Sequence, residues 1–333
     1  MTAPLVSVLL PAFDAGATIE LSLRSIQRQT HASWECIVVD DGSRDGTAAI
    51  ARGLGDPRIR VLSLPHGGIV RALTAGLAEC RGAFVARMDA DDVAHRMRLE
   101  LSLRALDQHP SWVAVGSHVR MFPRGSLKGG LYAYEAWLNS MQDASDVRRE
   151  RFVECPIAHP TLVIRRDVLG RYGYRSAGWA EDYDLFLRLL EDGHSLGVVP
   201  RRLLGWRDGL TRLSRTSVEC SMDRMVACKA AFLAAGFLQN SERYVLWGYG
   251  DTGKKLARAL TEHDRRPVAI VELHPGRIGQ RIAGAPVIPP SELPKIGRHP
   301  ILASVAGPGP RSEIRAALRE MGFQEDRDFL CCA

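Results

Sequence analysis

The chain reads Val85-Ala86-Arg87-Met88-Asp89-Ala90-Asp91-Asp92 at the point where an apolar strand ends in three carboxylates. Carboxylates grouped at the end of a strand repel one another unless a positive charge lies between them. Hard divalent cations such as Mg²⁺ and Mn²⁺ accept oxygen ligands of this kind. The stretch therefore predicts a cation site at the end of a buried strand. The alternative is an acidic turn that caps the next helix, with Asp92 as its N-cap.

Strand-like and helical segments alternate around this stretch. Short apolar runs predict strands at residues 6–10, 36–39, 59–62 and 83–88, and helical periodicity predicts helices at 18–29, 47–54 and 68–80. Such alternation is typical of an α/β fold, in which helices cover both faces of a mostly parallel sheet. Ligands of these sheets bind beyond the carboxyl ends of the strands. We therefore expect the acidic turns at residues 40–41 and 89–92 to face one crevice.

The alternation loosens after Asp92 and restarts near residue 244. We expect strands at residues 112–121 and 160–165, helices at 98–109, 132–152 and 181–190, and a connecting helix at 217–235. Further strands are expected at 244–247, 267–272, 301–305 and 329–332, with helices at 254–262 and 311–321. This pattern predicts a first domain at residues 1–215, a helical connector at 216–241 and a small second α/β domain at 242–333.

The composition is that of an ordinary soluble protein of 333 residues with a formal net charge of +6. The arginines are scattered and form no dense basic block with interleaved aromatic residues, so we expect no nucleic-acid partner. No apolar run reaches the length of a membrane span, and residues 1–11 lack the basic start of a signal peptide. Seven cysteines without zinc-site spacing indicate the reducing cytoplasm. The basic charge is compatible with peripheral attachment at the inner membrane face.

Four short motifs follow one another along the first domain. They are Pro11-Ala12-Phe13-Asp14, residues 38–47, Asp89-Ala90-Asp91-Asp92 and residues 179–185. Their order and character resemble the family 2 glycosyltransferases over roughly residues 3–215. The resemblance implies the GT-A fold and a nucleotide-diphosphate sugar as donor. The processive-synthase signature Q-x-x-R-W is absent, so we expect an enzyme that adds one sugar.

The first two motifs would hold the nucleotide. Asp40 stands where this family has an aspartate that hydrogen-bonds the nucleobase, commonly the N3–H of uracil. A carboxylate suits an imide N–H because it only accepts hydrogen bonds. Pro11, Phe13 and Asp14 are expected to line the donor site, and Asp14 replaces an asparagine that is common there. An ordinary β-turn leading into a helix would use the same residues.

The third motif matches the D-x-D motif of the family. The resemblance implies that Asp91 binds Mg²⁺ or Mn²⁺ directly and that Asp89 contacts the ribose or the waters of the metal. Ala90 would line the donor site between them. The cation would neutralise the diphosphate as it departs. Asp92 is expected to cap a helix or to lie behind the metal ligands, and Arg71 either reaches the diphosphate or faces solvent.

The fourth motif contains the pair Glu181-Asp182, which resembles the catalytic acids of the family. Carried over, Asp182 is the general base that takes the proton of an acceptor hydroxyl, and the reaction inverts the anomeric centre. Glu181 and His159 are expected to bind the acceptor. The alternative for the pair is a helix start enriched in acids by the macrodipole. His159 is as well explained as a structural histidine.

Two arginines follow the acid pair. Arg207 and Arg212 lie where related enzymes have a loop that closes over the donor, so both are candidates for the diphosphate. Ordinary surface arginines are the alternative.

The second domain has a glycine-rich turn, Gly248-x-Gly250-x-x-Gly253, after a strand and before a helix. Glu272 ends the next strand, which is the context of a nucleotide-binding fingerprint. The domain resembles the small Rossmann-like domain of sugar O- and N-acyltransferases, and it is too short for a full dinucleotide fold. We predict nucleotide contacts for Gly248, Gly250, Gly253 and Glu272. A scaffold or an oligomerisation domain remains the alternative, so homo-oligomers stay open.

These observations predict an inverting, metal-dependent hexosyltransferase of surface polysaccharide or glycoconjugate synthesis. Its partners would be a nucleotide-diphosphate sugar, with a UDP-sugar expected, and a saccharide or lipid-linked acceptor. A sugar nucleotidyltransferase would need a glycine- and Lys/Arg-rich loop after the first strand, which residues 11–14 lack. A regulatory protein with an inactive transferase domain would have lost one acid of the set, and an NAD-linked oxidoreductase would show a proton-relay residue beside the second domain's turn. The sequence leaves open the donor sugar, the nucleobase, the acceptor and the linkage.

Overall fold

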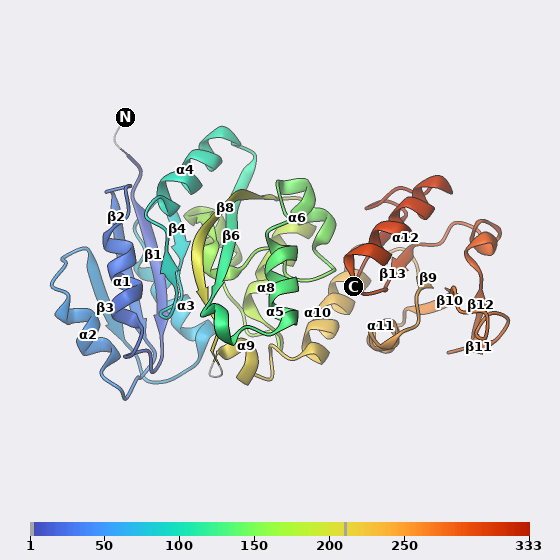
Figure 1. Ribbon diagram of the computed structural model, residues 1–333, viewed down its shortest axis with the longest axis horizontal. Coiled ribbons are helices and arrows are strands. Elements are labelled where there is room, and N and C mark those ends of the chain that lie inside the picture. Colours follow the sequence, from blue (N-terminus) through green and yellow to red (C-terminus); the bar gives the residue numbers. More distant parts are fainter. Residues whose placement is uncertain (1–2, 210–211) are drawn as a thin grey trace. The chain divides into compact units, whose positions relative to one another are not determined.

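Figure 1 presents a computed structural model, which describes residues 3–209 and 212–333. The chain divides into two compact units, each with its own hydrophobic core. The first unit comprises Met1–Arg148, Pro156–Ala177 and Glu181–Arg212, and the second comprises Arg149–Cys155, Gly178–Ala180 and Leu213–Ala333. No helix in the described part of the chain has both the length and the apolar character needed to cross a membrane.

The first unit is built on a sheet of eight described strands in the order β3-β2-β1-β4-β7-β6-β8-β5. The strands are β1 Val6–Ala12, β2 Trp34–Asp40, β3 Ile59–Ser63, β4 Phe84–Arg87, β5 Val93–Ala94, β6 Trp112–Phe122, β7 Val163–Arg165 and β8 Ser195–Arg207. Strands β3, β2, β1 and β4 are parallel, as are β6 and β8, whereas β7 and β5 run antiparallel to their neighbours. The sheet is therefore mostly parallel, as the sequence predicts.

Helices cover both faces of this sheet (Figure 1). The helices are α1 Ile19–Gln27, α2 Thr47–Gly53, α3 Ile69–Glu79, α4 Arg98–Gln108, α5 Gly129–Leu138, α6 Ala144–Glu150, α7 Arg166–Tyr172 and α8 Glu181–Glu191, with 3-10 turns η1 Arg124–Ser126 and η2 His159–Thr161. Side chains of α1, α2 and α4 share a core with Val8 and Leu10 of β1. Helix α3 packs on the opposite face, because a Cβ on Gly76 would lie 2.4 Å from Leu9 and 2.5 Å from Val39. Alternate residues of a strand point to opposite faces, which explains this division.

Several elements of the first unit differ from the prediction, and helix α7 and the two-residue strand β5 were not predicted. The expected helix at 132–152 is two helices, α5 and α6, with a break at residues 139–143. Strand β8 was not predicted, although it has 13 residues and pairs with β6 along most of its length. Its sequence contains Pro200 and two adjacent arginines, and its register with β6 shifts, so it lacks the alternation that marks a strand.

The second unit contains a sheet of six described strands in the order β11-β12-β10-β9-β13-β14. Strands β12, β10, β9, β13 and β14 are parallel, and β11 forms an antiparallel hairpin with β12. The elements are α9 Leu213–Thr216, α10 Met222–Ala235, β9 Arg243–Trp247, α11 Asp251–Thr261, β10 Arg266–Val271, β11 Arg281–Ile282, β12 Ala285–Ile288, η3 Pro290–Lys295, β13 Ile301–Ala303, α12 Pro308–Glu320 and β14 Phe329–Cys331. The sequence did not predict β11 and β12, which are short.

A segment from the middle of the chain, residues 149–155, packs within the second unit. Glu150 is buried and lies 2.8 Å from Nη1 of Arg315, and Val153 packs against the apolar core. Nζ of the buried Lys229 donates to the carbonyl of Val153 at 2.7 Å. Buried charges need partners of opposite charge or hydrogen bonds, and these contacts supply them. Sequence periodicity could not reveal this segment's position because its partners lie more than 70 residues away.

Candidate active site

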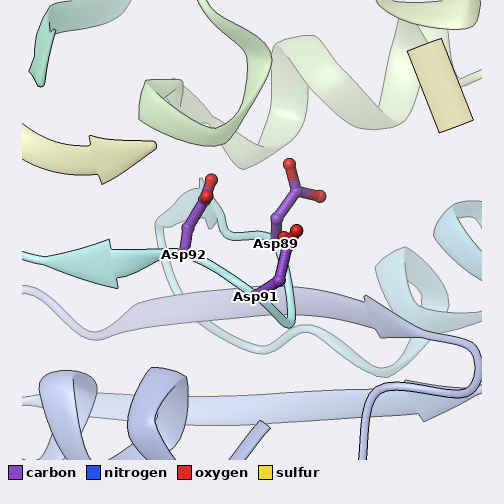
Figure 2. Close-up of side chains that lie close together, drawn as sticks. All are labelled: Asp89, Asp91 and Asp92. Atoms are coloured by element: carbon purple, nitrogen blue, oxygen red, sulfur yellow. The ribbon is translucent and has the colours of Figure 1, made fainter. Parts of the chain in front are cut away.

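The three carboxylates of residues 89–92 lie together on the loop between β4 and β5 (Figure 2). One oxygen each of Asp89, Asp91 and Asp92 lies within 4.8 Å of the other two. Ala90, between them, is buried. The loop leaves the carboxyl end of β4, which pairs in parallel with β1, so the cluster lies at the sheet edge where ligands of α/β folds bind.

Asp92 is fully buried and only half satisfied. Its Oδ1 accepts a hydrogen bond from the backbone N–H of Arg207 at 2.7 Å, whereas Oδ2 has no partner among the residues that the structure describes. Helix α4 begins only at Arg98, so Asp92 does not cap a helix and that alternative is wrong. Burial, and then the charges of Asp89 and Asp91, raise the pKa of Asp92 well above its ordinary value. A hard divalent cation would satisfy the unpaired oxygen and relieve this repulsion, so the donor set fits Mg²⁺ or Mn²⁺.

Arg207, which ends β8, and Arg212, further along the chain, both act on Asp91. Nε of Arg207 donates to the backbone carbonyl of Asp91 at 2.8 Å, and the guanidinium of Arg212 lies 4.4 Å from the Trp206 ring centroid. Burial and the charge of Asp89 raise the pKa of Asp91, and the positive charge of Arg212 partly opposes this rise. Both arginines therefore lie beside the acidic cluster, and their contact with a diphosphate stays a prediction.

Arg87 is a residue that the sequence analysis missed. It ends β4, is only 5% exposed and forms an ion pair with Asp89. Its charge also acts on Glu181 and Asp182, where it lowers the pKa of both. Within the described chain Nε of Arg87 has no hydrogen-bond partner. The available signal was an arginine in a strand that is otherwise apolar, immediately before the acidic turn.

The acid pair begins helix α8. Burial, and next the charge of Asp182, raise the pKa of Glu181 to about 7. Burial also raises the pKa of Asp182, although its Oδ1 accepts a hydrogen bond from the N–H of Tyr183 at 2.7 Å. A helix macrodipole alone would stabilise the charged forms and lower both pKa values. The opposite direction shows that burial dominates, which makes the pair more basic at neutral pH.

His159 lies beside this pair. It is buried, its Nε2 lies 3.0 Å from the Tyr174 hydroxyl, and its Nδ1 lies 3.7 Å from Oε1 of Glu181. Burial, and then the charge of Arg87, lower the pKa of His159 well below its ordinary value. A neutral imidazole therefore adjoins Glu181, and the acceptor role of both residues stays a prediction.

Asp40 is the last residue of β2, and Asp14 follows the neighbouring parallel strand β1. Oδ1 of Asp40 accepts a hydrogen bond from the N–H of Ser43 at 3.1 Å. Oδ1 of Asp14 accepts one from the N–H of Arg44 at 2.8 Å, and the N–H of Asp14 donates to Ser43 Oγ at 2.9 Å. Asp14 has a φ of 47°, a conformation that aspartate and asparagine tolerate. The two loops thus hold each other at one sheet edge.

The other predicted donor residues also belong to this edge. Pro11 is buried in β1, whereas Phe13 is 48% exposed and its ring stacks on His66 with 4.3 Å between centroids. Arg71 lies in the first turn of α3 and donates to the carbonyl of Pro65 at 3.3 Å. Phe13 and His66 therefore present an aromatic surface near Asp14, and Arg71 lines the adjoining loop.

Asp41 has a structural role next to Asp40. Its carboxylate accepts hydrogen bonds from the N–H groups of Gly67 and Gly68 at 2.9 and 2.8 Å, and Nδ1 of His66 lies 2.9 Å from Oδ2. These contacts hold the loop that precedes α3 and thereby support the Phe13–His66 stack.

The predicted residues of the second unit lie around the carboxyl end of β9. Gly248 has a φ of +94°, and Gly250 precedes the first residue of α11. A Cβ on Gly253 would lie 2.2 Å from the carbonyl oxygen of Gly248, so only glycine permits this close packing. Oε1 of Glu272 accepts a hydrogen bond from the N–H of Tyr249 at 2.7 Å.

The GT-A-type sheet and the acidic loop at its carboxyl edge define a glycosyltransferase, and comparison with known families agrees. The family model described as "Glycosyl transferase family 2" matches residues 7–173, which is half of the chain. The protein therefore belongs to glycosyltransferase family 2.

Two bacterial relatives are themselves named as glycosyltransferases. The chain is 27% identical over 231 residues to the putative glycosyltransferase EpsE of Bacillus subtilis, which covers 67% of this chain and 80% of EpsE. It is also 27% identical over 191 residues to an Escherichia coli enzyme, the UDP-Glc:alpha-D-GlcNAc-diphosphoundecaprenol beta-1,3-glucosyltransferase WfgD, covering 57% of this chain and 71% of WfgD.

Solved structures share the fold. Staphylococcus aureus TarS 1–349 in complex with UDP-GlcNAc aligns with a TM-score of 0.57 at 17% identity, over 78% of this chain and 72% of that chain. The mannosyltransferase PcManGT of Pyrobaculum calidifontis, in complex with GDP-Man and Mn²⁺, aligns with a TM-score of 0.53 at 18% identity, over 79% of this chain and 70% of that chain. At these identities the likeness establishes the GT-A fold alone.

Proposed function

We propose that this glycosyltransferase transfers a hexose from a nucleotide-diphosphate sugar to a hydroxyl group, with the help of a divalent cation and with inversion of configuration. One observation supports this function above all others. Arg87 is buried, pairs with Asp89 of the acidic cluster and acts electrostatically on the acid pair Glu181-Asp182. The group that would face the diphosphate and the group that would face the acceptor thus share one buried cation.

The cation would be held by Asp91, with Asp89 contacting the ribose or the metal's waters and Asp92 lying behind them. Oδ2 of Asp92, unpaired among the described residues, supports a cation in this position. Mg²⁺ or Mn²⁺ would act as a Lewis acid on the diphosphate. Arg207, which ends β8, and Arg212, further along the chain, would add positive charge beside the cluster.

Asp182 would act as the general base. Its carboxylate takes the proton of the acceptor hydroxyl, whose oxygen attacks the anomeric carbon from the side opposite the leaving group. The bond between the anomeric carbon and the phosphate oxygen breaks, and the nucleoside diphosphate leaves with the electron pair. The raised pKa of Asp182 suits this role, because a base is most effective when its pKa approaches the working pH. His159 and Glu181 would orient the acceptor.

The donor would lie over the loops that follow β1 and β2. Asp40 would accept a hydrogen bond from the nucleobase, and the exposed ring of Phe13 would pack against it. Pro11, Asp14 and Ala90 would line the pocket, and Arg71 would reach toward the diphosphate. A UDP-sugar is favoured, since TarS was solved with UDP-GlcNAc, although the neighbour PcManGT holds GDP-Man.

The acceptor would be a saccharide or a lipid-linked saccharide of a surface polysaccharide. WfgD, by its name, acts on a diphosphoundecaprenol-linked sugar, which supports such an acceptor. A lipid-linked acceptor would bring the enzyme to the inner face of the membrane, where the net charge of +6 favours anionic lipid head groups.

The second unit would be a Rossmann-like domain. Its five parallel strands have the order β12-β10-β9-β13-β14, so the chain reverses direction across the sheet between β9 and β13. Numbered along the chain, this is the order 3-2-1-4-5 of a mononucleotide-binding half extended by two strands. The boundaries proposed for the domains are residues 1–215, 216–241 and 242–333.

A panel of nucleotide sugars tests the proposal. The purified chain is incubated with UDP-, GDP-, dTDP- and ADP-sugars in Mn²⁺, Mg²⁺ or EDTA, and binding and slow donor hydrolysis are measured. We expect one donor to bind and hydrolyse only with a cation. A transfer product with the retained anomeric configuration, or full donor turnover in EDTA, would refute the mechanism. Release of pyrophosphate from a nucleoside triphosphate would instead identify a nucleotidyltransferase.

A further inference from the structure

The glycine-rich turn of the second unit lies at a reversal of strand order. Strand β9 has β10 on one side and β13 on the other, and the chain crosses from β9 to β10 through helix α11. The reversal opens a crevice at the carboxyl ends of the strands in folds of this type, and ligands bind there. The turn between β9 and α11 lies at this edge. It contains Gly248, which has a φ of +94°, and Gly250, which precedes α11.

The start of α11 leaves backbone donors available. The first N–H groups of a helix lack partners within the helix, and none of the described side chains caps this helix start. The first hydrogen bond of the helix runs from the N–H of Lys254 to the carbonyl of Gly250 at 2.9 Å. Asp251, at the first helical position, has a 98% exposed side chain, and its Oδ1 lies 3.8 Å from Nζ of Lys254, which balances its charge. Such a helix start favours an anionic ligand.

Ser304 gives an independent indication of a ligand. It follows β13, is 2% exposed, and its Oγ has no hydrogen-bond partner in the described part of the molecule. Its N–H donates to the carbonyl of Trp247 at 2.8 Å, which sets it beside Gly248. Its Cβ lies 3.7 Å from the position that a Cβ on Gly253 would take, so the hydroxyl-bearing carbon faces the start of α11. A buried hydroxyl without a partner is costly unless a ligand or water satisfies it.

The side chains of Glu272 and Arg277 lie beside the turn that follows β9. Oε1 of Glu272 accepts hydrogen bonds from the N–H of Tyr249 at 2.7 Å and from Nη1 of Arg277 at 3.0 Å. Among the described residues, Oε2 of Glu272 makes no hydrogen bond, so it can still accept two from a vicinal diol. Nη1 of Arg277 also donates to the carbonyl of Tyr249 at 3.1 Å, and its side chain is 40% exposed. The guanidinium therefore keeps donors that can meet a phosphate.

We propose that the second unit holds a separate, metal-independent site for the nucleoside-diphosphate group of a ligand. The diphosphate lies on the start of α11 and beside Arg277, Ser304 donates its hydroxyl proton to a phosphate oxygen, and Glu272 accepts hydrogen bonds from the ribose diol. The described strands supply one complete mononucleotide half and only two strands of a second, which favours a nucleoside diphosphate over a dinucleotide. The proposal goes beyond the transferase function of the first unit and does not depend on it.

Calorimetric titration of the full chain tests this site. UDP, GDP, CDP and ADP are titrated in EDTA, and ADP-ribose and NADH serve as larger probes. We expect one nucleoside diphosphate to bind without metal. Glu272→Ala and Ser304→Ala should each weaken that binding roughly tenfold, because each removes a hydrogen bond to a charged or buried group. The matched controls Glu262→Ala and Ser312→Ala, at exposed positions of the same unit, should leave it unchanged.

A 2′-deoxy nucleoside diphosphate sharpens the test. It should bind roughly tenfold more weakly than the ribose form to the native chain and equally weakly to Glu272→Ala, since both changes remove the same contact. Thermal unfolding without ligand verifies that each variant folds.

Absence of any nucleoside-diphosphate binding in EDTA would overturn the proposal. Binding whose affinity is unchanged by both Glu272→Ala and Ser304→Ala would overturn it as well. NADH binding without nucleoside-diphosphate binding would overturn the assigned ligand class. An Asp91→Ala substitution separates the two sites, because it should abolish metal-dependent donor binding and leave the metal-independent binding intact.

Discussion

The carboxyl edges of the two sheets have the same architecture and opposite chemistry. In the first unit the loops after β1, β2 and β4 present acids, and Asp92 and Glu181 are buried with raised pKa values. In the second unit the loops after β9 and β13 present glycine, backbone N–H groups and a buried serine, with one carboxylate at Glu272. Among the described residues, a group of three possible metal ligands occurs only in the first unit.

This difference shows that parallel strands fix where a ligand can lie, while the residues after the strands decide what that ligand is. Buried carboxylates are costly without a cation, and they gain basicity from the same burial. Glycine turns and helix starts carry no charge that burial would penalise, and their backbone N–H groups favour anions directly. The first edge is therefore suited to catalysis with a metal, and the second to binding without one.

The largest expected effect is loss of the proposed base. Asp182→Asn keeps the shape of the side chain and removes its ability to take a proton, so transfer should fall roughly 1,000-fold. Donor binding and metal-independent binding in the second unit should both persist. Product formation is followed by chromatography, with Asp107→Asn, at an exposed position of α4, as the matched control. Transfer at the native rate would remove Asp182 from the mechanism.

Loss of the proposed metal ligand should come next. Substitution of groups behind a metal ligand typically costs about 10–100-fold in metal affinity, so Asp91→Asn, which alters the ligand itself, should cost at least about 100-fold. Mn²⁺ titration followed by donor binding measures this change. If the variant kept native Mn²⁺ dependence, the cation would have to lie elsewhere.

Arg87 should have a smaller but distinct effect. Arg87→Met removes the buried charge that pairs with Asp89 and opposes the raised pKa values of the acid pair, so transfer should fall about 10–100-fold. Arg87→Lys should recover part of the activity, because it restores the positive charge but not the planar guanidinium. Arg81→Met, exposed just before β4, is the control. If the native chain and the three variants were equally active, Arg87 would not link the acidic cluster to the acid pair.

The pH dependence should report the acid pair. Asp182 must lose its proton before it can act as a base, so activity should rise with pH through the raised pKa of Asp182 and level off above it. Neighbouring carboxylates repel each other, and Glu181→Gln removes one charge. The pKa of Asp182 should then fall, and the rising limb should move to lower pH. A limb that stays in place would show that another group controls activity.

The smallest expected effect concerns the second unit. Gly253→Ala places a methyl group 2.2 Å from the carbonyl oxygen of Gly248, which should reduce the free energy of unfolding by about 1–3 kcal/mol. Gly309→Ala, in helix α12, meets no atom within 4 Å and should be neutral or slightly stabilising. Urea unfolding measures both. Equal stability of the two variants would show that the turn relaxes enough to accept the methyl group.

The sequence predicted most of what is local. The strands at β1, β2 and β4 were found because their residues are continuously apolar, and the acidic turns were found because carboxylates follow them directly. Strand β8 was missed because its pairing with β6, and not its own periodicity, makes it a strand. Asp92 was assigned a possible cap, since the sequence could not show that the N–H of Arg207 would meet its carboxylate.

The sequence by itself determined the α/β class, the family and the acids that end the strands, because these depend on residue type and short-range order. Only the tertiary structure decided which charges are buried and which oxygens lack partners. Both depend on residues far along the chain: the charge of Glu181 acts on Arg87, and the N–H of Ser304 donates to the carbonyl of Trp247. Those long-range contacts set the basicity of the first edge and left the serine hydroxyl of the second without a protein partner among the described residues.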